Sequence, residues 1–126
     1  MSSKSNNPYE NLERIFHEPN RLAIMSLLCG ATHGLTFNEL KERCDLTDGN
    51  LSRHLKALED GGAVSIKKSF VGVRPQTMIS LSSKGRQNFL DYLKALEEVL
   101  QKAAEAARPE KKEARHPLRS AKPARA

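Results

Sequence analysis

The stretch from Thr47 to Gly62, TDGNLSRHLKALEDGG, constrains the fold more than any other part of the chain. Thr47 is a candidate helix N-cap, because its hydroxyl can accept an N–H group of the first turn. Leucines follow at the spacing that buries one stripe of a helix, at Leu51, Leu55 and Leu58. Gly61 and Gly62 then supply a left-handed stop. The stretch therefore predicts a capped helix with one narrow buried stripe.

The opposite face of this predicted helix carries small, amide-bearing and cationic side chains. Its members are Gly49, Asn50, Arg53, Lys56 and Ala57. Amide and guanidinium groups match base edges in the DNA major groove, and cations match phosphates. The pattern therefore favours a helix that faces a duplex, and the alternative is an ordinary solvated face.

Two helices are expected near the N-terminus. Asn7 and Pro8 open the first, as cap and first-turn residue, and it should end near Glu18 because Pro19 follows. Its apolar stripe consists of Leu12, Ile15 and Phe16. The second runs from Pro19 to Gly30 and is apolar nearly all round, which predicts a central, buried helix.

A third helix is expected immediately before the opening stretch. Thr36 and Glu39 have the spacing of a capping box, after a strand of one or two residues at Leu35. The helix should run to about Cys44, and residues 45–46 form a tight turn. Its expected buried residues are Phe37, Leu40 and Cys44. Two helices joined by such a turn form the helix-turn-helix pattern.

The hydrophobic period then changes to two. Val64 and Ile66 alternate with polar residues, which predicts a half-buried strand. Residues 70–75 contain Gly and Pro and are expected to form a loop, and alternation resumes over residues 77–81 as a returning strand. A hairpin after a recognition helix makes a winged helix, and its cations are Lys67, Lys68 and Arg74.

The last expected helix begins after a Ser82 or Ser83 cap. Apolar residues recur along it at Phe89, Leu93, Leu96, Leu100, Ala103 and Ala107. From Ser83 to Ala107 it would be roughly 37 Å long, too long for a core of this size to cover. We expect a second copy of the chain to cover this heptad-like seam, and the alternative is a solvated, frayed end after about Leu100. The expected dimer interface consists of Leu12, Ile15, Phe16, Phe89, Leu93, Leu96, Leu100 and Ala103.

Length and charge suggest one domain with two tails. The chain has 126 residues and a net charge of +6. We expect residues 1–6 to be disordered, residues 7–107 to form the domain, and residues 108–126 to form a disordered basic tail. The tail holds seven cations and two carboxylates, so DNA binding by the domain must depend on where its charges lie.

Several function classes find little support. Two cysteines, Cys29 and Cys44, do not make a disulfide framework, and each is expected to be a small buried hydrophobe rather than a thiol or metal sensor. No His lies at ligand-like spacing from either cysteine, so we expect no metal. The residues offer neither a nucleophilic constellation nor a phosphate-cradling glycine loop, so we expect no enzyme and no cofactor. Without a signal-peptide core or a membrane-spanning run, a cytoplasmic protein is expected.

The order of these elements resembles the MarR/ArsR-like winged-helix regulators of bacteria and archaea. The likeness is greatest to the subgroup of single-domain winged-helix DNA-binding proteins. It depends on HEPNRL (17–22), LTFNELK (35–41), LTDGNLSRHL (46–55) and KSFVGVRP (68–75), and it covers about residues 8–100. It implies a mainly α fold with a small hairpin (α+β), and a homodimeric transcriptional regulator, expected to be a repressor. The paired-cysteine metal motif of the arsenic- and zinc-sensing relatives is missing.

The resemblance and the helix face together give an expected DNA site. Its residues are Thr47, Gly49, Asn50, Ser52, Arg53, Lys56, Lys68 and Arg74. Asn50 and Arg53 would contact base edges, and Thr47, Ser52 and Lys56 would bind phosphates. The resemblance places residues 51–61 in the major groove and the wing tip, residues 72–74, at the minor groove. A dimer would prefer a near-palindromic double-stranded operator. The alternative is a winged-helix protein-interaction module without specific DNA binding, and no residue cluster identifies a small-molecule effector.

Overall fold

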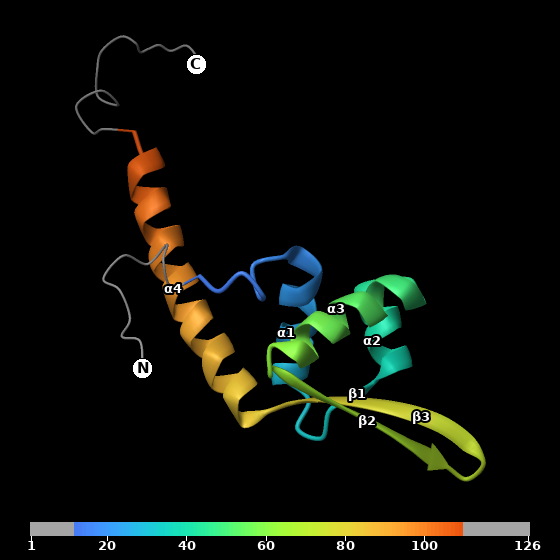
Figure 1. Ribbon diagram of the computed structural model, residues 1–126. Helices are drawn as coiled ribbons and strands as arrows, with labels where there is room; N and C mark the ends of the chain where they lie inside the picture. The colour runs from blue at the N-terminus through green and yellow to red at the C-terminus, as the bar shows by residue number, and fades with distance from the viewer. Residues whose placement is uncertain (1–11, 110–126) are drawn as a thin grey trace.

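The computed structural model describes residues 12–109, and the expectations for the Asn7 cap, for residues 1–6 and for the tail from residue 110 lie outside them. Four helices and three strands follow in the order α1 (Pro19–Cys29), β1 (Leu35–Thr36), α2 (Phe37–Cys44), α3 (Asp48–Asp60), β2 (Val64–Val71), β3 (Arg74–Leu81) and α4 (Ser83–Ala107). Figure 1 shows α1, α2 and α3 gathered on one side of the sheet, with α4 running up the left of the picture from the end of β3. This is an α+β winged-helix fold, as the sequence predicted.

The expected first helix is wrong for the residues described. Residues 12–18 contain only a turn over residues 14–16, in which N–H groups bond to carbonyls three residues earlier. The carbonyl of Ile15 would serve the N–H of residue 19 in a helix, but Pro19 has none. Arg21 takes that place, because its Nε donates to the Ile15 carbonyl at 2.7 Å. Pro19 therefore ends one segment and begins α1, which Glu18 caps.

Helix α1 is less deeply buried than its composition predicts. Its fully buried residues are Ile24, Met25 and Leu28. Ala23 and Ser26 are exposed, because α1 packs against α2, α3 and β3 and its remaining side faces solvent. The expectation of burial on all sides is therefore wrong for this helix.

The helix-turn-helix unit forms as its capping residues predict. Both bonds of the capping box between Thr36 and Glu39 are present, at 2.8 and 3.0 Å. Asp45 ends α2 with φ 54°, and Thr47 caps α3 by accepting the Asn50 N–H at 3.2 Å. At the far end of α3 the left-handed residue is Gly62, with φ +78°.

The hairpin is longer than the sequence suggested. The sheet has the antiparallel order β1-β3-β2, and β2 pairs with β3 as far as Val71 and Arg74. Only two residues make the turn, and Gly72 has φ +65°, as a tight hairpin of this kind requires. Pro75 fits in β3 because successive residues of a strand direct their N–H groups to alternate edges. The nitrogen of Pro75 faces the edge of β3 away from β2, and β1 does not extend that far, so no hydrogen bond is lost. The expected loop over residues 70–75 is therefore wrong.

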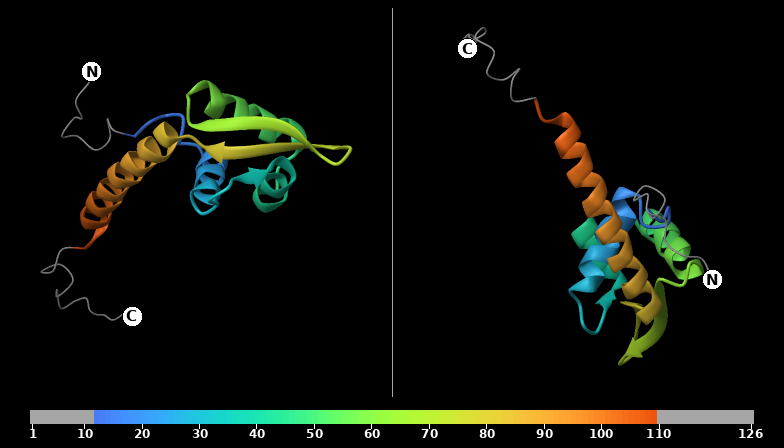
Figure 2. Two further views of the ribbon diagram at one scale, coloured as in Figure 1. Left: turned by 90° about the horizontal axis from the view of Figure 1, so that it is seen from below. Right: turned by 90° about the vertical axis from the view of Figure 1, so that its left-hand side faces the viewer.

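The core joins all layers through one aromatic cluster. The Phe16 ring lies edge-on to Phe89 and Tyr92, with centroids 5.3 and 5.6 Å apart. These contacts hold the first half of α4 against the N-terminal segment, and Figure 2 shows the same two elements from two further directions. The remaining core residues are Ile24, Met25, Leu28, Leu35, Leu40, Leu51, Leu55, Leu58, Ala63, Val64 and Ile79. Phe37 and Cys44, also expected to be buried, are only partly so.

The packed face of α4 differs from the expected seam. Its buried residues are Gly85, Phe89, Tyr92 and Ala95. Phe16 and Phe89, each 1% exposed, belong to the core of the protomer, so placing them in a dimer interface is wrong. The aromatic contacts of Tyr92 rotate the helix so that Leu90, Leu93 and Leu100 remain exposed. The last turns of α4 project away from the other elements in Figures 1 and 2.

Candidate nucleic-acid interface

Helix α3 has a buried side and a polar side, as its leucine spacing predicts. Leu51 and Leu58 are completely buried and Leu55 is 2% exposed. On the opposite side Asn50, Arg53 and Lys56 are all exposed. Helical periodicity thus separates the groups that hold α3 in the core from those that face outward.

The outward side chains form one ordered pair. An Arg53 Nη2–H donates to Asn50 Oδ1 at 3.2 Å, which joins residues one turn apart. Lys56 Nζ lies 3.2 Å from Asp60 Oδ1 in an exposed ion pair. Such an exposed pair is weak and exchanges readily for another anion. The face therefore offers an amide, a guanidinium and an ammonium group in that order along α3.

A groove separates this face from the wing. Its volume is about 530 Å³, and its lining residues come from the start of α2, from α3 and from the two long strands. Lys56 lies on its α3 side and Lys68 on its wing side. Glu59 is the acidic residue in the lining, which also includes Phe37, Ser52, Leu55, Ile66 and Thr77.

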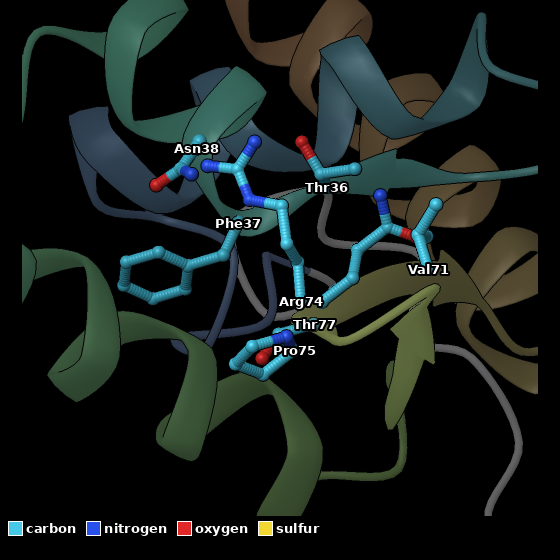
Figure 3. A pocket seen from close by; sticks show the side chains of 8 residues that line it. Thr36, Phe37, Asn38, Val71, Arg74, Pro75 and Thr77 are labelled. Carbon is cyan, nitrogen blue, oxygen red and sulfur yellow. The ribbon is translucent and has the colours of Figure 1, made fainter.

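Arg74 lies on the other side of the wing. It lines a cavity of about 520 Å³ with Thr36 and Asn38 at the start of α2, and its guanidinium extends toward them (Figure 3). The outermost residue of the turn is instead Val73, which is 92% exposed. The wing tip is therefore apolar, and its cation is directed toward the body of the domain.

All residues expected at DNA are exposed. They are Thr47, Gly49, Asn50, Ser52, Arg53, Lys56, Lys68 and Arg74. The first six share α3 and its cap, Lys68 faces α3 across the groove, and Arg74 stands apart at the second cavity. The sequence did not identify Glu59 and Thr77 as groove residues. The one available signal was the alternation over residues 77–81, which indicates that the Thr77 side chain points to one defined face of its strand.

Comparison with known proteins identifies the fold. Residues 20–100 match the model of the winged helix DNA-binding domain. The chain belongs to this family. An uncharacterized protein of Methanocaldococcus jannaschii is 45% identical over 80 residues, which cover 64% of this chain and 86% of that protein.

Solved structures agree with the winged-helix assignment. A transcriptional regulator homologue from Pyrococcus horikoshii OT3 has a TM-score of 0.70 and 28% identity, over 79% of this chain and 98% of that one. A MarR-family regulator from Rhodococcus sp. RHA1 has a TM-score of 0.61 and 14% identity, over 81% and 71% of the two chains. A Mycobacterium tuberculosis regulator in complex with DNA has a TM-score of 0.59 and 18% identity, over 86% and 76%. The last two show the fold alone. The resemblance to winged-helix DNA-binding proteins is confirmed, and the matched family is one of DNA-binding domains rather than enzymes.

Other chemistry finds little support in this winged-helix domain. Burial raises the pKa of the Cys44 thiol, which keeps it protonated, and neither cysteine is in a disulfide. Among residues 12–109, His, Cys, Asp and Glu side chains do not gather in threes as ligands of a metal ion would. Over the same range, every helix is too short or too polar to cross a membrane.

Proposed function

We propose that this winged-helix protein is a homodimeric transcriptional regulator that binds double-stranded DNA in a sequence-specific way, acts as a repressor and works in the cytoplasm. The outward face of α3 carries the proposal, because Asn50, Arg53 and Lys56 are exposed while the leucines behind them are buried. The fold shared with a regulator bound to DNA supports duplex DNA as the partner.

The groove beside α3 suggests how a duplex would dock. With α3 in a major groove, the wing reaches the adjacent minor groove, and one phosphate strand must cross the space between them. That space is the groove lined by Lys56 and Lys68. Ser52 and Thr77 add hydroxyl donors there, while Glu59 repels phosphate from its own side. Asn50 and Arg53 then face base edges.

The exposed leucines of α4 supply the proposed dimer contact. Leu90, Leu93 and Leu100 are 46%, 36% and 60% exposed, on a helix that projects beyond the domain. Burial of each side chain by a second copy would contribute up to about 1.5–3 kcal/mol. Leu12, Ile15, Leu96 and Ala103 remain in the proposed interface. Two α3 helices related by a dyad would then contact a near-palindrome, with major grooves about 34–36 Å apart.

The test begins with selection of bound duplexes from a random pool. Arg53→Ala should weaken binding to the selected site by roughly 1–3 kcal/mol and relax preference at one base position. Arg86→Ala removes the same charge from an exposed position on α4 and is the matched control. Equal weakening on selected and scrambled duplexes would make Arg53 a phosphate contact instead.

One observation favours a second candidate, a protein-interaction module. Phe70, Val71 and Val73 expose apolar surface at the wing tip, at 71%, 59% and 92%. Contiguous apolar surface of this kind often marks a protein contact. Two results together would favour this candidate. The selection would enrich no duplex, and the mobility shifts of all sequences would disappear equally in 1 M salt, as expected for non-specific electrostatic binding.

A further inference from the structure

A polar cluster lies beneath α3, on the side away from the proposed DNA contacts. His54 is 3% exposed and is the one polar residue in the core among residues 12–109. Its Nδ1 lies 3.2 Å from Arg21 Nη1 and 3.9 Å from Glu18 Oε1. A guanidinium has donors only, so Nδ1 must be the acceptor and carries no proton. The geometry therefore requires a neutral imidazole.

Arg21 connects three parts of the fold through this contact. Its Nε donates to the Ile15 carbonyl at 2.7 Å, and its backbone N–H donates to Glu18 at 2.8 Å. The Ile15 side chain lies over Gly61, at the C-terminal end of α3. The N-terminal segment, α1, the middle of α3 and its C-terminal end are thus held in one arrangement.

His54 is adjacent to Arg53 in sequence and points about 100° around α3 from it, into the core. Any rotation of α3 that moves the ring away from Arg21 also turns the Arg53 guanidinium away from its outward direction. We propose that Arg21 and Glu18 act through neutral His54 as positioning residues for α3, and that protonation of His54 weakens DNA binding. The proposal deepens the function proposed above and rests on it.

The surrounding charges explain why protonation would release the helix. Burial lowers the pKa of His54; Arg53 and Arg21 act in the same direction, and Glu18 opposes them. Burial also tends to raise the pKa of Glu18, but hydrogen bonds from the backbone N–H groups of Arg21 and Asn20 and the nearby Arg21 guanidinium lower it overall, so Glu18 stays ionised. A protonated ring carries a hydrogen on Nδ1, so it can no longer accept the hydrogen bond from Arg21. Its positive charge would be repelled by the Arg21 guanidinium and attracted to the Glu18 carboxylate. The Arg21–His54 hydrogen bond cannot survive that change.

The sign of the pH effect is diagnostic. Because the pKa of His54 lies below its usual value of 6.5, the unfolded chain takes up this proton first as pH falls. The contribution to stability is therefore present above pH 6.5 and is lost progressively below it. Protonation of an exposed histidine has the opposite effect on DNA binding, because added positive charge strengthens attraction to phosphates. Weaker binding in acid would thus point to a buried histidine.

The experiment measures the dissociation constant of the full chain for a selected duplex at about pH 7.5 and about pH 5.5, at constant ionic strength. Circular dichroism at each pH verifies that the protein is folded. We expect the affinity of the unaltered protein to fall in acid, by at most about tenfold at about pH 5.5, because the pKa of His54 lies below 6.5. His54→Gln, which can still accept from Arg21 but cannot be protonated, should bind normally at neutral pH and lose the acid effect. His33→Gln, at an exposed loop position, should retain it.

Arg21→Lys provides a second test that does not alter the histidine. Lysine keeps the charge but cannot bond to Ile15 and His54 together, so we expect about tenfold weaker binding at neutral pH with an unchanged salt dependence. An acid effect that persists in His54→Gln, or unaltered binding by Arg21→Lys, overturns the proposal. Absence of any selected duplex at neutral pH refutes the DNA-binding function instead.

Discussion

Two glycines in helices should respond oppositely to the same added methyl group. In α3, Gly49 is exposed, and beyond its chain neighbours and its own helix backbone a Cβ built there would meet nothing within 4 Å. In α4, a Cβ on Gly85 would overlap the carbonyl group and Cα of Ala63. Gly49→Ala therefore adds helix propensity without a clash, whereas Gly85→Ala forces α4 away from the end of α3.

The magnitudes follow from these surroundings. Gly49→Ala should raise the free energy of unfolding by about 0.5–1 kcal/mol, because alanine loses less backbone entropy in a helix. For a domain of this size that corresponds to an increase in Tm of about 2–8 °C. Gly85→Ala should lower the free energy of unfolding by about 2–3 kcal/mol through overpacking. A small shift of α4 cannot relieve this clash, because two hydrogen bonds hold the start of the helix in place. The Ser82 hydroxyl donates to the Gly62 carbonyl at 2.6 Å, and the Ser82 N–H donates to the Ala63 carbonyl at 3.1 Å.

Thermal and urea unfolding followed by circular dichroism measure both changes. Destabilisation by Gly49→Ala, or a neutral Gly85→Ala, would refute the packing argument. Gly49→Ala also bears on function, because the added methyl group lies on the face proposed to approach DNA. It should reduce affinity for the selected duplex even though the protein is more stable. Equal affinity would indicate that the backbone at Gly49 stays clear of DNA.

Two further predictions concern the ends of the chain. Leu100→Asp places a charge on the projecting part of α4 and should convert the proposed dimer to a monomer of 14.0 kDa in analytical ultracentrifugation, while the exposed change Lys102→Asp should leave that dimer intact. A dimer that persists in Leu100→Asp would place the interface elsewhere. Removal of residues 110–126 should leave the melting temperature unchanged but flatten the salt dependence of DNA binding, because six of the chain's cations are lost. An unaltered slope would mean that this segment does not contact DNA.

The parts of the fold that sequence determined depend on neighbours along the chain. Thr36 with Glu39, and Thr47 with Asn50, make capping bonds across three residues, so their spacing alone identifies where α2 and α3 begin. The leucines of α3 recur with the helical period, and their burial was confirmed. The exposure of Asn50, Arg53 and Lys56 follows from the same periodicity. Their contact with DNA remains a prediction.

Tertiary structure decided what depends on residues far apart in sequence. Residues 12–18 have the pattern of a helix, but Phe16 packs between Phe89 and Tyr92 of α4, and Arg21 takes the Ile15 carbonyl. The same aromatic contacts set the rotation of α4 and leave Leu93 exposed. The partners of His54 are Arg21 and Glu18, 33 and 36 residues away in sequence, and no local sequence pattern predicts these contacts. Capping and periodicity depend on residues within about one helical turn, so the sequence shows them directly. Which face of a helix is buried depends on several elements packing together, and that is decided only when the chain is folded.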